Sequence, residues 1–282
     1  MTNPTLPTGS PVAARDRDLD QALQRVAARF APAARDIILY ENRLKHLFEL
    51  RRILRSAAAA GAVCDLGGGL GINLLALREA GWTGRLVLVD QLDEYDEHNR
   101  MGSWHSAARL LDDAGIEVLR QDFWRHWQLP LPDGGFDVAT CLDVVEHLPG
   151  HPLRQLGELR RLLRPGGACL ISGPNGVSLM KRLRALAGRY PYAPLDEWLA
   201  DRYFEHYREY TRGEYEELLR RAGFSAVASR ASAAVSLSRA RYRYHRRRLA
   251  ATSPRLAALW MLAGVEALLP GVRHGVYAWG RA

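Results

Sequence analysis

Residues 63–71 read VCDLGGGLG and place Asp65 ahead of three regularly spaced glycines, Gly67, Gly69 and Gly71. The stretch follows a predicted strand and opens a predicted helix, so its backbone N–H groups and the helix dipole form a polar cradle. It is not a P-loop, because no lysine follows, and it lacks the dinucleotide fingerprint, because Ile72 stands where the third glycine belongs. An aspartate at the mouth of this loop repels a pyrophosphate and attracts a cation. The loop therefore predicts a site for a positively charged ligand.

A second acidic position ends the predicted strand LVLVD at 86–90. A carboxylate at the position of Asp90 can accept both hydroxyls of a ribose, as an acidic residue does in related nucleotide-binding folds. A nucleoside that carries an ammonium and a sulfonium fits both features, and S-adenosylmethionine (SAM) is such a molecule. With these motifs the chain resembles class I SAM-dependent methyltransferases, over roughly residues 58–232.

Further segments match the same family in order and spacing: QDFW at 121–124, FDVATCLDVVEHL at 136–148, LLRPGGACLISGPN at 162–175 and HYREYTRGEYEELLRRAGF at 206–224. The resemblance implies that Asp122 holds the adenine amino group and Phe123 packs on the base. It also implies cofactor contacts from Gln91, Leu142 and Asp143. Taken without the resemblance, Asp90 is a possible helix cap, Asp122 a turn residue and Phe123 a core residue.

Two histidines are the candidates for acid–base chemistry. Methyl transfer from a sulfonium needs positioning and a dry pocket, and a hydroxyl or amine acceptor must also lose its proton to a base. His147 and His206 are expected near the ends of the sheet, where they can take that proton. Asp143 and Glu146 precede His147 at helical spacing. The alternative interpretation of this triplet is an ordinary helix start with Asp143 as the N-cap.

The same triplet together with His206 also resembles a Mg²⁺ site of small-RNA 3′-end methyltransferases and of certain ubiquinone-pathway O-methyltransferases. There the metal acts as a Lewis acid on adjacent acceptor hydroxyls. This chain departs from that pattern at Asp143, where the relatives carry a longer glutamate. The metal content is therefore left open at this point.

The elements that position these residues alternate along the chain. Short apolar runs predict strands at 62–66, 85–90, 116–120, 136–142, 167–172, 225–231 and 274–280. Amphipathic runs predict helices at 71–80, 102–114, 152–164 and 211–223, the last with Thr211 as N-cap, Glu214 completing a capping box and Gly223 after its end. This alternation predicts an α/β fold with a Rossmann-like, mostly parallel seven-stranded sheet and helices on both faces.

The expected organisation has three parts: a disordered N-terminus at 1–16, a helical cap at 17–57 and the methyltransferase domain at 58–282. Within the domain we expect two insertions. Residues 176–210 follow the fifth strand and cover the substrate site, and residues 239–270 form a basic and then apolar helical insertion before the last strand.

The composition is that of a soluble globular protein, with 48% hydrophobic residues and three cysteines in predicted strands. No secretory signal or membrane-spanning run stands out, so we expect a cytoplasmic protein. The chain carries a formal net charge of +8, and its stretch RARYRYHRRR at 239–248 interleaves arginine with tyrosine. Such a stretch can bind RNA or lie on an anionic membrane, but a solvated helix face beside a packing or dimer helix is favoured.

These observations predict a SAM-dependent methyltransferase that acts on an oxygen, rather than a nitrogen, of a small bacterial metabolite or glycan-type acceptor. The alternatives are an RNA 3′-end-type Mg²⁺-dependent methyltransferase, an NAD(P)-dependent oxidoreductase and a methyltransferase-like partner protein without activity. Peripheral membrane contact and a homodimer also stay open.

Overall fold

The structure, a computed structural model, describes residues 16–58, 60–93, 101–192, 195, 206–232 and 253–282. Its strands are β1 (Val63–Leu66), β2 (Leu86–Asp90), β3 (Glu117–Arg120), β4 (Phe136–Leu142), β5 (Leu163–Pro174), β6 (Ser225–Ser232) and β7 (Gly275–Arg281). They form one seven-stranded sheet in the order β3-β2-β1-β4-β5-β7-β6, in which β7 runs antiparallel to both of its neighbours. The predicted mostly parallel Rossmann-like sheet is confirmed.

The strand order reverses between β1 and β4, because the chain runs outward from β1 through β2 to β3 and then returns to the other side of β1 as β4. β1 is buried along its whole length and pairs in parallel with β2 on one side and β4 on the other. In open α/β sheets, ligands bind beyond the carboxyl ends of the strands at such a switch point. The glycine loop after β1 and the Asp143 segment after β4 meet at this place.

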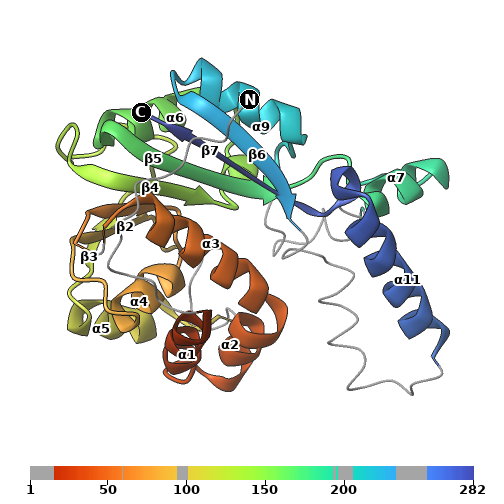
Figure 1. Cartoon of the computed structure of the whole chain (residues 1–282), viewed down its shortest axis with the longest axis horizontal. Coiled ribbons are helices and arrows are strands. Elements are labelled where there is room, and N and C mark those ends of the chain that lie inside the picture. The colour runs from red at the N-terminus through yellow and green to blue at the C-terminus, as the bar shows by residue number, and fades with distance from the viewer. Residues whose placement is uncertain (1–15, 59, 94–100, 193–194, 196–205, 233–252) are drawn as a thin grey trace.

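Helices cover both faces of the sheet (Figure 1). One face carries α1 (Asp16–Ala27), α2 (Pro32–Asp36), α3 (Arg43–Ser56), α4 (Ile72–Glu79) and α5 (Trp104–Asp113), which share one hydrophobic core. The other face carries α6 (Leu153–Leu162) and α9 (Arg212–Arg221), which share a second. The α9 helix has the predicted capping box between Thr211 and Glu214, and Gly223 beyond it has a φ of +88°.

The N-terminal helices pack directly on the methyltransferase core. A π-helical turn, η1 (Ile37–Glu41), joins α2 to α3, and α3 buries Leu47, Leu50 and Ile53 against the sheet. The apolar spacing seen in the sequence accounts for this buried face. Helix α3 thereby brings its polar residues to the carboxyl end of the sheet.

Two segments depart from the predicted boundaries. The α6 helix ends at Leu162 and β5 already begins at Leu163, whereas the sequence predicted a helix to 164 and a strand from 167. The β4–β5 pairing is irregular there, shifting from Phe136–Leu163 to Val138–Ala168, so the Pro-Gly-Gly turn lies within the strand. The sequence did not predict that β5 begins before residue 167, because the proline and glycines at Pro165–Gly167 are typical of turns.

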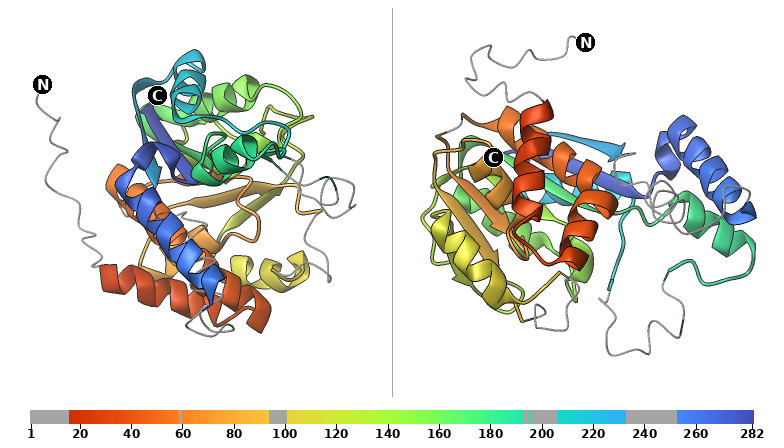
Figure 2. Two further views of the ribbon diagram at one scale, coloured as in Figure 1. Left: turned by 90° about the vertical axis from the view of Figure 1, so that its right-hand side faces the viewer. Right: turned by 90° about the horizontal axis from the view of Figure 1, so that it is seen from below.

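The segments after β5 and before β7 contain α7 (Leu179–Leu186), α11 (Pro254–Leu268) and the short η4 (Pro270–Val272). Helices α7 and α11 project from the same side of the sheet (Figures 1 and 2). Residues 1–15 of the N-terminus predicted as disordered over 1–16, parts of the 176–210 insertion and the arginine-tyrosine stretch at 239–248 lie outside the described residues. Asp16 is the first residue of α1, so the prediction was wrong at that residue. In the described part of the chain, every helix is too short or too polar to cross a bilayer.

Candidate active site

The loop between β1 and α4 is built around glycines in the left-handed region. Gly67, Gly69 and Gly71 have φ angles of +73°, +57° and +70°, which other residues adopt only at a cost. A Cβ on Gly67 would lie 2.4 Å from Cγ2 of Val144, so the loop packs closely against the segment that follows β4. Gly71 is also the N-cap of α4, which directs that helix terminus at the loop.

Asp65 lies beneath this loop with only 3% of its surface exposed. The Thr140 hydroxyl on β4 donates a 2.6 Å hydrogen bond to its Oδ1. Burial raises the pKa of Asp65 to about 7, although the Thr140 hydrogen bond opposes this shift. A cation bound beside Asp65 would restore the charge that burial disfavours, in agreement with the predicted cationic ligand.

Asp90 at the end of β2 is tied to the glycine loop. Its Oδ2 accepts a 2.9 Å hydrogen bond from the Gly69 N–H, and its Oδ1 accepts one of 2.8 Å from the Leu92 N–H. Burial raises the pKa of this carboxyl, and the backbone hydrogen bonds partly offset that effect. Asp90 and the partly buried Gln91 therefore stand at the mouth of the loop, in the place predicted for a ribose.

The structure shows Asp122 as a turn residue. Its Oδ1 accepts hydrogen bonds from the backbone N–H groups of Trp124 and Arg125, at 3.0 and 3.2 Å. Phe123 is partly buried and packs against the second hydrophobic core, and its carbonyl accepts a hydrogen bond from Gln155. The adenine contacts assigned to Asp122 and Phe123 by resemblance remain predictions.

After Leu142 at the end of β4, Asp143 adopts a left-handed conformation with a φ of +54°. It does not cap a helix: the following turn, η2 (Val145–His147), is a short 3₁₀ helix whose N-cap is Val144. The Ser172 hydroxyl on β5 donates a 2.8 Å hydrogen bond to Oδ1 of Asp143, and Lys45 from α3 forms an ion pair with Oδ2. Burial alone would raise the pKa of Asp143, but Lys45 outweighs it and the pKa lies below its ordinary value.

Helix α3 adds a buried polar network that sequence reasoning missed. The Tyr277 hydroxyl on β7 donates to Oε1 of Glu49 at 3.0 Å, and the Asn73 amide on α4 donates to Oε2 at 2.9 Å. The ring of His46 is hydrogen-bonded to the same Asn73 at 2.9 Å. These contacts fix α3, and with it Lys45, over the carboxyl edge of the sheet.

His147 and His206 come together as a pair. Their ring centroids lie 4.7 Å apart in an edge-to-face arrangement, although the residues come from η2 and from the segment before α9. Buried Glu146 completes the cluster, since one potential ligand atom from each of the three residues lies within 4.8 Å of the others. Its Oε2 has no hydrogen-bond partner among the described residues. Burial and the nearby Asp143 raise the pKa of Glu146 well above its ordinary value.

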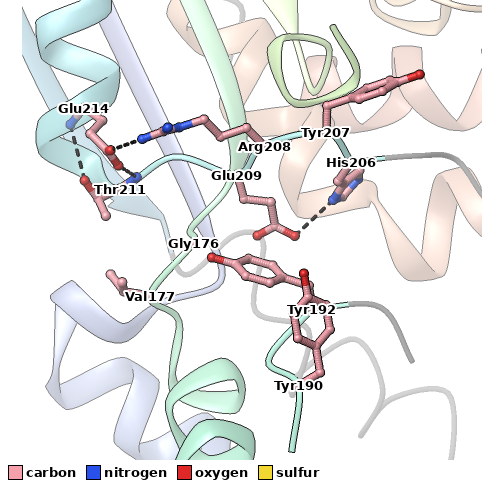
Figure 3. Close-up of a pocket in the computed structure, with 10 residues that line it drawn as sticks. All are labelled: Gly176, Val177, Tyr190, Tyr192, His206, Tyr207, Arg208, Glu209, Thr211 and Glu214. Carbon is pink, nitrogen blue, oxygen red and sulfur yellow. Dashed lines mark hydrogen bonds and ion pairs between the residues drawn. The ribbon is translucent and has the colours of Figure 1, made fainter. Parts of the chain in front are cut away.

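Glu209 and Lys181 hold His206 in place. Its Nδ1 lies 3.0 Å from Oε1 of Glu209 (Figure 3). Glu209 in turn forms an ion pair with Lys181 on α7. Lys181 also donates a 3.1 Å hydrogen bond to the Asn175 carbonyl. Because an ionised carboxylate only accepts hydrogen bonds, Nδ1 carries the hydrogen and Nε2 is the acceptor nitrogen of the ring. Burial, with His147 and Lys181, lowers the pKa of His206 to about 4, so the ring is neutral at neutral pH.

Lys45 and Lys181 share a sequence signal that was available. The chain has 39 lysines and arginines in total, but only these two are lysines. Both lie next to carboxylates of the candidate site, at Asp143 and Glu209. Because lysine is so rare in this arginine-rich chain, the two residues could have been singled out from the sequence. Their carboxylate partners could not be identified without the fold.

A pocket of about 340 Å³ opens beside His206. The segment after β5 and the segment before α9 line it, with Tyr190, Tyr192, Tyr207 and Glu209 among its walls (Figure 3). This pocket therefore adjoins the histidine pair, in the region predicted to cover the substrate.

Comparisons with known proteins bear on the family of the chain. Residues 14–229 match the family described as "Methyltransferase domain". A protein of Mycolicibacterium smegmatis named "Probable S-adenosylmethionine-dependent methyltransferase" is 38% identical over 97 residues, which cover 34% of this chain and 32% of that protein. The ubiquinone biosynthesis O-methyltransferase of Psychrobacter arcticus is 31% identical over 125 residues, 42% of each chain. The matched part thus spans less than half of these curated relatives.

Among solved structures, a SAM-dependent methyltransferase from Mesorhizobium loti shares the fold. It superposes with a TM-score of 0.54 at 20% identity and covers 84% of this chain and 97% of that one. These matches favour SAM over the nicotinamide coenzyme of the oxidoreductase alternative. The chain belongs to the methyltransferase-domain family, through the match of residues 14–229, and this family and fold are those of class I SAM-dependent methyltransferases.

Proposed function

We propose that this protein transfers the methyl group of SAM to an oxygen of a small-molecule acceptor held beside His147 and His206. The observation that carries the proposal is the histidine pair itself, which stands next to Asp143 at the switch point and adjoins the pocket. The partial match to an O-methyltransferase supports oxygen over nitrogen as the acceptor atom.

Each group has a role in such a reaction. Asp65 and Asp90 would hold the cationic cofactor and its ribose, while Asp143, fixed by Lys45, lies on the other side of the loop. When bound, SAM would supply the methyl group: its sulfur–methyl bond would break as the acceptor oxygen bonds to the methyl carbon, which leaves the neutral thioether S-adenosylhomocysteine. The hydroxyl proton passes to Nε2 of His206, which the Glu209 hydrogen bond to Nδ1 makes the acceptor nitrogen of the ring.

Methyl-labelled SAM tests this proposal. Incubation with a panel of phenols, glycosides, amines and a short RNA, followed by NMR of the products, identifies the methylated atom and separates the RNA alternative. We expect a methyl ether, and we expect His206→Gln to lower kcat by about 10²- to 10⁴-fold while SAM binding is retained. His151→Gln is the matched control, because His151 is exposed and lies outside the site. A methylamine product, or equal activity of both variants, would refute the proposal.

A divalent cation is a second candidate component, favoured by one observation. Potential ligand atoms of Glu146, His147 and His206 lie close together. The buried Oε2 of Glu146 has no hydrogen-bond partner among the described residues, as expected of an atom that coordinates a metal ion. These three residues would hold the ion, which supplies Lewis-acid polarisation of an acceptor hydroxyl when bound. Titration of the chelator-treated protein with Mg²⁺ and Mn²⁺ should show binding that Glu146→Gln abolishes. Unchanged activity after EDTA treatment would remove the metal from the account.

A further inference from the structure

The pocket beside His206 has features that constrain the acceptor. Its location rests on the proposed function, because His206 lines the pocket and also belongs to the histidine pair. Its volume of about 340 Å³ lies near the lower end of the range for small-molecule sites, about 300–1,000 Å³. A single ring with short substituents is therefore a suitable occupant, and a polymer would have to leave most of its length outside.

Two tyrosines supply aromatic surface to this pocket. Tyr190 and Tyr192 lie with their ring centroids 5.5 Å apart at an interplanar angle of 61°, whereas the ring of Tyr207 points away from them (Figure 3). Tyr190 leaves 70% of its surface exposed, which is unusual for such a large apolar side chain. Tyrosine offers a flat face for stacking and a hydroxyl for hydrogen bonding, at little entropic cost.

The charges that line the pocket are already compensated. Arg208 and Glu214 form a 2.6 Å ion pair, and Glu209 is held between Lys181 and His206. An acceptor with a net charge would have to compete with one of these pairs and would lose part of its own hydration without a new partner. The electrostatics therefore favour an uncharged ligand over an anion or a cation.

We propose that this pocket binds the methyl acceptor as an uncharged, hydroxyl-bearing ring, which stacks on the tyrosines with its hydroxyl toward His206. A phenolic ring and a sugar ring share this chemistry. The charged alternatives are an aromatic carboxylate, an aromatic amine and an anionic phosphate ester, and the paired charges disfavour all three.

Matched probes test the proposal on the full chain saturated with S-adenosylhomocysteine. Hydroxybenzyl alcohol, hydroxybenzoate and hydroxybenzylamine share one ring and differ in charge, and methyl glucoside represents the sugar source. Binding is measured by saturation-transfer NMR and by titration. We expect the neutral aromatic probe or the glucoside to bind about tenfold more tightly than either charged analogue. Equal or tighter binding of a charged analogue, or no binding of either neutral ring, would overturn the inference.

Variants of one tyrosine locate the binding. Tyr192→Ala should weaken binding of the preferred neutral ring by about two- to tenfold, because it removes a stacking face, while Tyr192→Phe should retain most of the affinity. Trp260→Ala is the control, since Trp260 is an exposed aromatic residue of α11 outside the pocket lining. An equal effect of the Tyr192→Ala and Trp260→Ala changes would refute the location. If the ring binds but is not methylated, the proposed function is refuted and the binding site is not. If methyl transfer is unchanged in Tyr192→Ala, the location of the acceptor in this pocket is refuted and the proposed function is not.

Discussion

Replacing Gly67 by alanine tests the packing that joins the cofactor loop to the segment carrying the histidine. Two penalties add at this position. The φ of +73° costs an L-residue about 1–2 kcal/mol, and the new Cβ at 2.4 Å from Cγ2 of Val144 adds an overpacking cost of about 1–3 kcal/mol. We expect Gly67→Ala to lower the free energy of unfolding by about 2–5 kcal/mol and to weaken SAM binding.

Gly115→Ala isolates the backbone penalty. Gly115 has a φ of +61°, but no described heavy atom lies within 4 Å of its Cβ position, so only about 1–2 kcal/mol should be lost. Urea unfolding of both variants gives the difference between them. In a Val144→Ala background the cost of Gly67→Ala should shrink to the Gly115 value, because the clashing methyl groups are gone.

Two results would refute this reasoning. The first is an equal loss of unfolding free energy in Gly67→Ala and Gly115→Ala, which would mean that the loop does not pack on Val144. The second is an unchanged Gly67→Ala penalty in the Val144→Ala background, which would mean that a different contact constrains the loop.

Three further predictions concern ligand binding and proton position. Asp90→Ala should weaken SAM at least about tenfold in calorimetric titrations, because charge-assisted hydrogen bonds contribute about 1.5–3 kcal/mol each; unchanged affinity would exclude Asp90 as a ribose ligand. The pKa of Asp65 is about 7 before binding, and its ionised form favours the cation, so SAM should bind about tenfold more weakly near pH 6 than near pH 8. Asp65→Asn should abolish that dependence, and its persistence would contradict the assignment. Glu209→Gln should move hydrogen from Nδ1 to Nε2 in part of the His206 population, seen by nitrogen-15 NMR, and lower kcat without changing SAM affinity, whereas Arg208→Gln should leave the tautomer unaltered.

The parts of the site that local sequence determines could be predicted. Gly67 and its neighbours were recognisable because the left-handed turn needs glycine, and the ends of α9 were recognisable because Thr211 and Glu214 satisfy backbone groups three residues apart. Strand positions followed from apolar runs. Asp65 was recognisable by its place before the glycine loop and Asp90 by its place at the end of a predicted strand; that they hold SAM stays a prediction.

The parts that depend on distant contacts could not be predicted. Lys45 meets Asp143 only because α3 packs on the sheet, and the two residues are far apart in the chain. The alternative interpretation of Asp143 as an N-cap is wrong, because its backbone is left-handed and its carboxylate is held by Lys45 and Ser172 instead of by helix N–H groups. Glu209 gains its role only when the segment before α9 is placed against α7.

A crystal structure with S-adenosylhomocysteine and hydroxybenzyl alcohol tests the central claim most directly. The account predicts that the thioether sulfur faces the histidine pair and that the probe's hydroxyl lies within hydrogen-bonding distance of Nε2 of His206. A cofactor whose sulfur points away from His147 and His206, or an acceptor bound elsewhere with its oxygen facing the sulfur, would contradict it.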